Sequence, residues 1–443
     1  MNFDISLKSG VNVIYGRNGL GKTTLLHIIA NISELDVDRF NHLKFKKITI
    51  ENNEGNKIEL VKEDGVLSIL INGQETGYER NKATLSDVEK ESIRAVIGER
   101  AAYLPAFRSV LERMRESSHY GYEERNKPEF ETLNQAEMQA MNIVLQRAPY
   151  SVRDLIQNNV TKTLRCREWF GSFVPFVRYP SITDVVSGLS DEWSSAQLSI
   201  SKLEQKQFET AFGEIFAAIA KGDVGGDHLD QAALLDEIKE LVAADDGHVQ
   251  GPNRMSAYLQ LVDIAEQTDG NTQKYGNILE IYRNKLRDRK SSREDVLSPI
   301  NTFQDSVNGF LKEKHFRIGN ASPTKPRQFR ESHVFVEPNS GGRYPITALS
   351  SGERQIVTML YSTSRTIVKT GCCLIDEPEL SLHIDWQRIV IEQIEKQHQG
   401  RQIIACTHSP EVGADHDDRV IFFEPFASST SEDESDLDEA IGL

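Results

Sequence analysis

The chain has 443 residues, of which 38% are apolar and 27% charged, a balance typical of globular proteins with a sizeable core. Its formal net charge of −16 argues against broad, non-specific binding to nucleic acid, which requires a positive electrostatic field. We expect a cytoplasmic protein without membrane contact: no apolar run is long enough to span a bilayer, the first residues lack a secretory pattern, and the four cysteines show no disulfide or metal spacing.

A phosphate-binding motif lies early in the chain, where Gly-Arg-Asn-Gly-Leu-Gly-Lys-Thr at 16–23 fits the P-loop pattern G-x-x-x-x-G-K-[ST]. An apolar run precedes it and apolar residues at helical spacing follow it, the strand–loop–helix context that the motif requires. The alternative is a glycine-rich turn that matches by chance. Backbone N–H groups and the helix dipole would bind phosphate, the lysine would reach the β- and γ-phosphates, and the threonine hydroxyl would bind Mg²⁺. The residues expected to bind ATP here are Gly16, Asn18, Gly19, Gly21, Lys22, Thr23 and Thr24, with Thr23 also on the metal.

Residues 44–75 alternate polar and apolar side chains in runs that are separated by turn signals. Such alternation places the apolar side chains on one face only. The segment is therefore predicted to form an antiparallel meander with one solvated face.

The middle of the chain, from about 109 to 315, is predicted to be mostly helical, because four stretches space their apolar residues by three and four positions. No heptad pattern continues long enough for a long coiled coil, which favours a compact helical lever or a short hairpin arm. The four stretches are 196–221, 229–243, 254–266 and 271–289.

Two basic stretches, 147–178 and 283–290, could contact phosphate backbones. The alternative, which we favour, is a solvated helix face, or a basic face that docks against an acidic neighbour in this acidic protein. The first stretch also carries aromatic residues, which more often indicate core or subunit contact than base stacking. These aromatic residues are Trp169, Phe170, Phe173 and Phe176.

Three polar segments follow in the C-terminal part. Ser351 and Gly352 precede an apolar helical stretch, whose first N–H groups make an anion site, although such a pair also occurs as a plain helix cap. Asp376 and Glu377 end an apolar strand: the first would hold Mg²⁺, mostly through water, and the second would act as general base on the attacking water. An ordinary acidic turn is the alternative. His408 follows the next apolar strand.

These motifs, in this order, resemble those of the SMC/RecF/OLD-like branch of ABC-type ATPases, to which ATPases of bacterial anti-phage systems such as Septu and PARIS belong. The resemblance rests on Asp-Glu-Pro-Glu-Leu-Ser-Leu-His at 376–383, Asp-Trp-Gln at 385–387 and Thr-His-Ser-Pro at 407–410. It implies an α/β fold: a P-loop ABC-type ATPase head with an antiparallel β-arm, interrupted by a mostly helical insertion. It also implies that His408 is the switch histidine that contacts the γ-phosphate.

The same resemblance implies that Leu-Ser-Ser-Gly-Glu at 349–353 is the signature sequence, which closes over the nucleotide of a different subunit. Two copies of the chain would then meet head to head around ATP, as a homodimer or a higher homo-oligomer. Arg108 ends a segment similar to one in OLD-like ATPases, which makes it a candidate nucleotide sensor, with an ordinary surface arginine as the alternative. Ile384 replaces a proline that is common in the family, so the roles of Ser381 and His383 stay open.

The expected organisation is an N-terminal lobe of the ATPase head at 1–108, a helical insertion or short coiled-coil arm at 109–315, a C-terminal lobe at 316–425 and an acidic, disordered tail at 426–443. The expected function is a slow, regulated ATPase that switches an effector in anti-phage defence, with a phage-encoded trigger. OLD nucleases append a Toprim domain with clustered acids that we do not find, so a separate Toprim or HNH nuclease would act as effector. Alternatives are a DNA-repair or chromosome-maintenance ATPase that grips DNA, and a scaffold that assembles on ATP.

Overall fold

The computed structural model describes residues 2–78, 85–108, 110–111, 150–221, 231–246, 276–319, 333–364, 371–398, 401–414 and 417–425. The predicted helical stretch at 254–266 and the predicted acidic tail at 426–443 lie outside these residues. The chain divides into two compact units. The first comprises Met1–Val185, Ser306–His315 and Pro338–Leu443, and the second comprises Val186–Asp305 and Phe316–Glu337.

A five-stranded sheet forms the centre of the first unit, in the order β12-β1-β11-β10-β6, and its neighbouring strands are parallel. Val11 pairs in register with Ile403, which also pairs with Cys373, so the carboxyl ends of the three central strands lie at one edge. Ligand-binding loops gather at this edge in parallel sheets. The strands are β1 (Val11–Tyr15), β6 (Ala102–Leu104), β10 (Cys373–Asp376), β11 (Ile403–Thr407) and β12 (Val420–Phe422).

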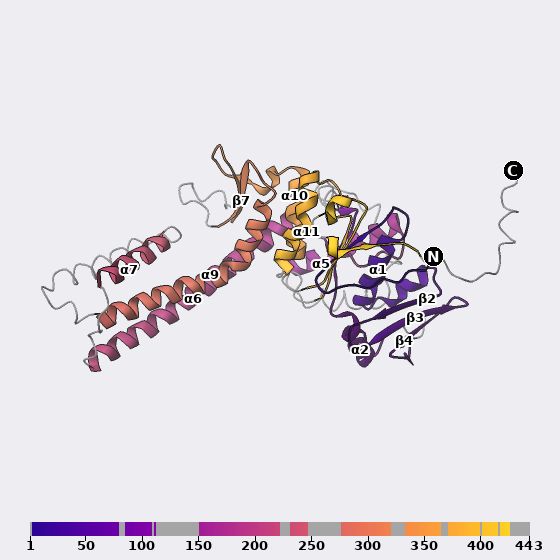
Figure 1. The fold of residues 1–443 in the computed structure, drawn as a ribbon, viewed down its shortest axis with the longest axis horizontal. Coiled ribbons are helices and arrows are strands. Elements are labelled where there is room, and N and C mark those ends of the chain that lie inside the picture. The colour runs from indigo at the N-terminus through magenta and orange to yellow at the C-terminus, as the bar shows by residue number, and fades with distance from the viewer. Residues whose placement is uncertain are drawn as a thin grey trace. The chain divides into compact units, whose positions relative to one another are not determined.

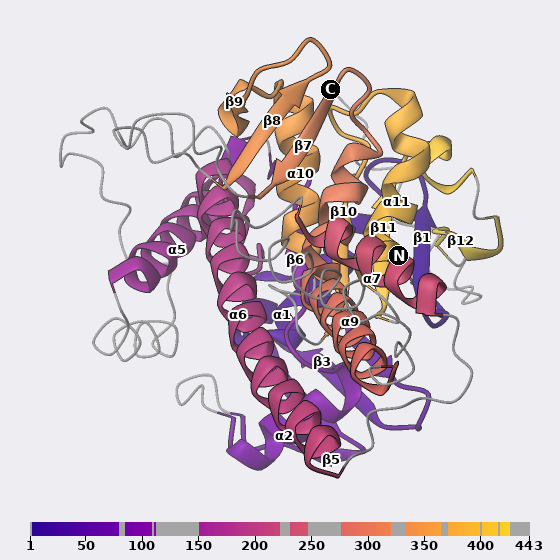
Figure 2. The same cartoon turned by 90° about the vertical axis from the view of Figure 1, so that its left-hand side faces the viewer.

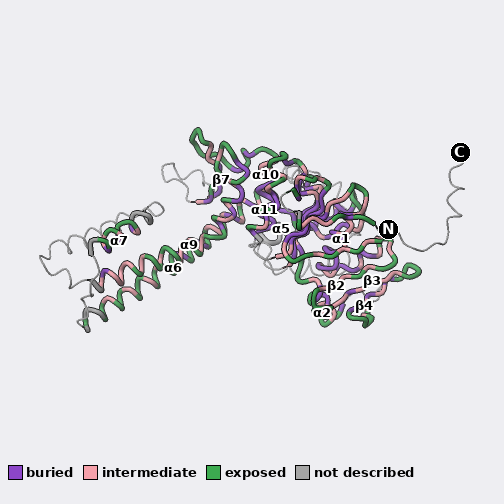
Figure 3. The backbone as a smooth tube through the Cα atoms, viewed as in Figure 1, coloured by how far each residue is buried: buried purple, intermediate pink, exposed green. Residues whose placement is uncertain are grey.

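The central strands are apolar on both faces because both faces are covered. Leu374 packs with Leu26 of helix α1 in one core cluster. Cys373 and Ile375 point to the opposite face and are fully buried as well. Figure 3 shows buried chain gathered between the labels of α11 and α1. The first unit also contains the helices α1 (Lys22–Ser33), α5 (Tyr150–Phe170), α10 (Ser351–Thr363) and α11 (Ile384–His398), and the 3₁₀ turns η1 (Val37–His42), η5 (Ile346–Ala348), η6 (Pro410–Gly413) and η7 (Asp417–Arg419).

The predicted antiparallel meander is confirmed and lies beside α1 (Figure 1). Its strands alternate buried and more exposed residues, and the buried face packs on α1 and α2 in a second core cluster that includes Ile32, Leu60 and Ile93. Helix α2 (Asp87–Ile97) begins with a capping box between Ser86 and Glu89. The strands are β2 (Lys47–Glu51), β3 (Lys57–Glu63), β4 (Val66–Ile71) and β5 (Gln74–Glu75), in that order in the sheet.

The second unit is mostly helical, which confirms the predicted helical insertion. Two long helices, α6 (Ile182–Lys221) and α9 (Gly276–Asn308), lie side by side (Figure 1), and the shorter α7 (Gln231–Asp246) lies in the same unit. Strands β7 (Lys314–Ile318) and β8 (Val334–Pro338) are neighbours in a small sheet (Figure 2), and β9 (Tyr344–Pro345) follows them in the chain. No helix among the described residues is both long enough and apolar enough to cross a membrane.

Candidate nucleotide-binding site

The P-loop connects β1 to α1, and its backbone requires glycine. Gly19 and Gly21 have φ angles of +82° and +99°, in the left-handed region that favours glycine. At Gly16 the constraint is space, because a Cβ there would lie 3.1 Å from both the Cβ and the carbonyl oxygen of Phe423. The glycines of the sequence motif are therefore explained by the shape of the loop.

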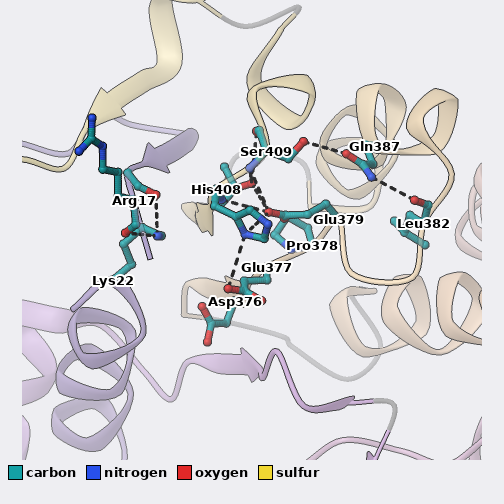
Figure 4. A network of polar contacts seen from close by, with 12 residues as sticks. Arg17, Lys22, Asp376, Glu377, Pro378, Glu379, Leu382, Gln387, His408 and Ser409 are labelled. Atoms are coloured by element: carbon teal, nitrogen blue, oxygen red, sulfur yellow. Dashed lines mark hydrogen bonds and ion pairs between the residues drawn. The ribbon is translucent and has the colours of Figure 1, made fainter. Parts of the chain in front are cut away.

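Lys22 is the first residue of α1, and its ammonium group folds back over the loop. Nζ donates hydrogen bonds to the carbonyl oxygens of Gly16 and Arg17 at 2.7 and 2.9 Å, and the side chain is buried (Figure 4). Asn18 and Thr23 are exposed, so the loop presents an open surface next to this ammonium group. A phosphate bound there would meet a helix N-terminus and a fixed positive charge.

Thr23 and Asp376 meet although they lie in opposite parts of the chain. The Thr23 hydroxyl donates to both carboxylate oxygens of Asp376, at 2.9 and 3.2 Å. Burial raises the pKa of Asp376 to about 6, and the hydrogen bond from Thr23 opposes that rise. A hydroxyl and one carboxylate fit Mg²⁺, which prefers oxygen ligands and takes the others from water and phosphates. These two residues would hold the metal.

Glu377 and His408 follow adjacent strands and lie close together (Figure 4). Glu377 has a φ angle of +48°, unusual for a residue with a side chain, and its N–H donates to the carbonyl oxygen of Cys406 at 2.8 Å. Nδ1 of His408 lies 3.6 Å from Oε1 of Glu377. A carboxylate able to accept a proton from water thus lies beside an imidazole, at the same edge of the sheet as the P-loop.

Glu379 belongs to this site, although the sequence analysis assigned it no role. Its Oε1 atom accepts hydrogen bonds from the Thr407 hydroxyl at 2.6 Å and from the backbone N–H groups of His408 and Ser409 at 3.0 and 3.2 Å. The same oxygen lies 3.2 Å from Nδ1 of His408. The sequence signal was present, since Glu379 is the last residue of Asp-Glu-Pro-Glu at 376–379.

Arg108 is not a surface residue, so that alternative from the sequence analysis is wrong. Its side chain is completely buried. Within the described residues, its guanidinium donates to the backbone carbonyl oxygens of Pro105, Asp376, Glu377 and Pro378. The arginine thus contacts the turn that follows β10.

The signature residues lie in the first turn of α10. The helix cap is Ser350, which forms a capping box with Glu353, so the cap interpretation applies to Ser350 and leaves Ser351 exposed in the first turn. A Cβ on Gly352 would lie 3.3 Å from the carbonyl oxygen of Ser381. Within the described part of the chain, no hydrogen bond links Ser351 or Gly352 to the P-loop.

The segment between β10 and α11 is tied to two neighbouring helices. Gln355 of α10 donates from Nε2 to the carbonyl oxygen of Leu380 at 3.0 Å, and Gln387 of α11 donates to that of Leu382 at 3.0 Å. Ser409, next to His408, donates to the Gln387 side chain at 2.8 Å (Figure 4). The signature helix and the histidine loop therefore both contact one turn of the same chain.

The basic stretch at 283–290 lies on α9, and its side chains pair with acidic neighbours. Lys285 contacts Glu214 at 2.8 Å, and Arg289 contacts Glu204 at 3.0 Å. Arg287 contacts Glu237 of α7 at 2.5 Å. These contacts support the docked basic face that the sequence analysis favoured over phosphate binding.

In the stretch at 147–178, Lys162 and Arg167 are buried. Lys162 donates to the carbonyl oxygen of Tyr179 at 2.6 Å, and Arg167 donates to that of Val174 at 3.0 Å. Both side chains therefore bind backbone carbonyl oxygens inside the core around α5. Arg147 lies outside the described residues.

Comparisons with known proteins agree with these motifs. Residues 262–415, which contain the signature, the Asp376–Glu377 pair and His408, match the family model described as "AAA domain, putative AbiEii toxin, Type IV TA system". This match supports the ATPase-head fold that the sequence motifs predict.

Two curated relatives are similar to part of this chain. The "Retron Ec83 probable ATPase" of Escherichia coli is 27% identical over 164 residues, which are 34% of this chain and 28% of that protein. The "Retron Vc95 probable ATPase" of Vibrio cholerae serotype O1 biovar El Tor is 26% identical over 153 residues, 33% of this chain and 29% of that protein. The match thus spans less than a third of the length of either relative.

Solved structures similar to the chain include Smc head domains. One, from Pyrococcus furiosus, has an extended coiled coil and is bound to the C-terminal domain of ScpA; it gives a TM-score of 0.34 at 13% identity, over 93% of this chain and 86% of that one. Another, bound to the C-winged helix domain of ScpA, gives 0.35 at 9% identity over the same shares. At these scores the likeness carries no argument about the fold, which is described by the strand order of the sheet.

Proposed function

We propose that this chain binds ATP with Mg²⁺ and hydrolyses the γ-phosphate bond. The observation that carries the proposal is the contact of Thr23 with Asp376 at one edge of the sheet, beside Lys22, Glu377 and His408. A P-loop alone also occurs in proteins that only bind nucleotides. A metal-binding hydroxyl next to a carboxylate, with a second carboxylate one residue further on, is what hydrolysis requires.

The residues divide the work as follows. Glycine-loop N–H groups and the N-terminus of α1 bind the phosphates, and Lys22 exchanges its carbonyl partners at Gly16 and Arg17 for phosphate oxygens. Bound Mg²⁺ would neutralise charge on the β- and γ-phosphates. Glu377 accepts the proton of the attacking water, and His408 contacts the γ-phosphate.

The site requires a second copy of the chain, whose Ser351 and Gly352 would close over the γ-phosphate. This is supported by the exposure of Ser351 at a capped helix N-terminus, which offers N–H groups to an anion. ATP would then hold two heads together, and its hydrolysis would release them.

The biological role that we propose is a slow, regulated switch in the cytoplasm of bacteria that controls a separate effector in anti-phage defence. The support is the partial similarity to two ATPases that are named as parts of retrons. A Toprim or HNH nuclease is the proposed class of effector, and a phage-encoded component the proposed trigger. The DNA-gripping alternative receives less support, because the basic side chains of α9 already contact carboxylates.

Substitution Glu377→Gln tests the proposed function. It removes the general base and keeps the size of the side chain, so hydrolysis should fall by about 100-fold or more while ATP binding persists. Phosphate release measures the first effect. Light scattering after gel filtration with ATP reports the persistence of ATP binding, because ATP that is bound but not hydrolysed should increase the fraction of dimer.

The matched control is Glu395→Gln, since Glu395 lies on α11 in an ion pair with Arg419 and outside the site. This variant should hydrolyse ATP at the wild-type rate. Wild-type hydrolysis by Glu377→Gln would contradict the assignment of the base, and absence of hydrolysis by the wild-type chain would contradict the proposed activity.

A further inference from the structure

Arg108 makes an unusual set of contacts for a buried arginine. Nη1 donates to the carbonyl oxygens of Pro105 at 3.2 Å and Asp376 at 2.9 Å, and Nη2 donates to those of Glu377 at 2.7 Å and Pro378 at 3.0 Å. Three consecutive carbonyl groups of the turn after β10 thus converge on one planar guanidinium. Its two Nη groups, held in a fixed planar fork, suit such an arrangement, which a lysine ammonium cannot reproduce.

Burying the charged guanidinium costs desolvation free energy, which an apolar side chain in the same place would not incur. Burial lowers the pKa of Arg108, and the nearby carboxylates Glu379, Asp376 and Glu377 oppose that effect. Yet none of the hydrogen bonds described for Arg108 goes to a carboxylate side chain. Its donors are directed at backbone oxygens, so the contact fixes the path of the main chain.

The turn that Arg108 holds contains the left-handed residue Glu377, with φ at +48°. Such a conformation persists only where the surroundings enforce it. Here the Glu377 N–H is held by the Cys406 carbonyl at 2.8 Å, and the Glu377 carbonyl is held by Arg108. With both peptide groups fixed, the direction in which the side chain leaves the main chain is fixed as well, and Oε1 lies 3.6 Å from Nδ1 of His408.

Arg108 is itself held by the core beside it. The ring of the preceding Phe107 stacks on Phe170 of α5, with centroids 4.2 Å apart. Leu111 belongs to a buried cluster with Cys166 and Val174. The residues on either side of Arg108 thus pack in the first unit, and its guanidinium connects this packed segment to the turn that carries the proposed general base.

We propose that Arg108 is a positioning residue for ATP hydrolysis, which acts by holding the 376–378 turn in the conformation that directs Glu377 at the attacking water. The inference rests on the proposed function. It assigns Arg108 no contact with the nucleotide, in contrast to a nucleotide sensor. Loss of the arginine should slow the chemical step and leave ATP binding nearly unchanged.

The test is Arg108→Lys, with Arg178→Lys as matched control. Arg178 is exposed and donates to the Glu34 carboxylate, so the control makes the same chemical change away from the turn. Arg108→Lys should lower kcat by about tenfold or more while KM and the Kd for ATP stay within about threefold of wild type. Arg178→Lys should leave all three unchanged.

The double variant Arg108→Lys/Glu377→Gln separates positioning from a general structural role. If Arg108 acts through Glu377, the single-turnover rate of the double variant should lie within about twofold of Glu377→Gln alone. Multiplied losses, a wild-type rate for Arg108→Lys, or a fall in ATP affinity that matches the fall in kcat would each overturn the proposal.

Thermal melts decide the case in which Arg108→Lys does not fold. Arg108→Gln, whose amide can still donate to two carbonyls, then takes its place, and loss of the cooperative transition in both variants would assign Arg108 to stability alone and overturn the proposal. The two proposals are contradicted by different results. If the wild-type chain binds ATP but does not hydrolyse it, the proposed function is wrong. If the wild-type chain and Arg108→Lys hydrolyse ATP equally fast, only the proposed role of Arg108 is wrong.

Discussion

A single buried oxygen of Glu379 contacts several groups of the loop that carries His408. Three hydrogen bonds converge on Oε1, and the same atom contacts Nδ1 of His408 at 3.2 Å. An acceptor at Nδ1 fixes both the orientation of the imidazole ring and the nitrogen that carries the proton. A phosphate oxygen only accepts hydrogen bonds, so the opposite nitrogen, Nε2, would contact it as an N–H donor of the imidazolium form.

Substitution Glu379→Gln should therefore impair His408 without removing it. The amide keeps the shape but loses the charge, and it cannot accept every hydrogen bond that the carboxylate accepts. We expect kcat to fall by about tenfold with the Kd for ATP nearly unchanged, measured by phosphate release and by fluorescent-nucleotide binding. Glu395→Gln again serves as the control. An equal loss of ATP affinity would show that Glu379 supports folding of the site rather than the histidine.

The motif residues could be predicted because their spacing is local, whereas their supports could not. Asp376 ends a strand, His408 follows one, and Lys22 and Thr23 begin the helix after the P-loop, each within a recognisable short pattern. Arg108 hydrogen-bonds to backbone carbonyls at 376–378, which carry no side-chain signal in the sequence. Only the strand order, with β6 next to β10, brings the two segments together.

At the scale of elements, a buried pair joins α1 to β6. Nε2 of His27 lies 2.8 Å from the Tyr103 hydroxyl. The two rings pack edge to face, with their centroids 5.3 Å apart. Burial lowers the pKa of His27 to about 4. The histidine is therefore neutral in the folded protein at pH values where the unfolded chain already binds a proton.

For this reason, the unfolding free energy of the first unit should decrease as the pH is lowered. The stabilising contribution of His27 is complete above about pH 6.5 and is lost as the pH falls, and the loss reaches about 3 kcal/mol near pH 4. Urea unfolding of wild type and of His27→Gln at pH 7.5 and 4.5 measures it, since the variant lacks this component. Equal losses of unfolding free energy in both proteins between the two pH values would contradict the assignment.

Most helices and strands could be predicted, because the spacing of apolar residues along the sequence differs between the two. Alternation gave the meander at 44–75, and apolar runs gave the strands before the P-loop and before Asp376. The start of α10 was less certain from sequence, because Ser350 and Ser351 both fit a cap and only the hydrogen bonds with Glu353 select the first.

For the whole molecule, the proposed site is shared between two copies, and this can be tested by mixing inactive chains. Lys22→Ala removes the phosphate lysine, and Gly352→Asp places a negative charge where the partner's γ-phosphate would lie. In a mixed dimer one of the two sites contains neither substitution. Equal mixing should restore about a quarter of the wild-type rate, by random pairing.

The control mixes Lys22→Ala with Glu377→Gln, which lie on the same side of the proposed site. A mixed dimer of these chains keeps no intact set of P-loop and general base, so no activity should return. Recovery in the control, or none in the first mixture, would contradict the shared site. Both mixtures should be preincubated with ATP, because ATP is the proposed bridge between the heads.

The strand order also has a consequence for how the protein is made. Strand β1 lies between β11 and β12, so both of its hydrogen-bonding neighbours come from a much later part of the chain. The P-loop that follows β1 leaves the ribosome early, yet its supporting strands and Asp376 arrive only after the helical unit has been synthesised. Pairings of such long sequence separation form slowly. The nascent chain should thus be unable to complete its proposed nucleotide site until translation has passed β12.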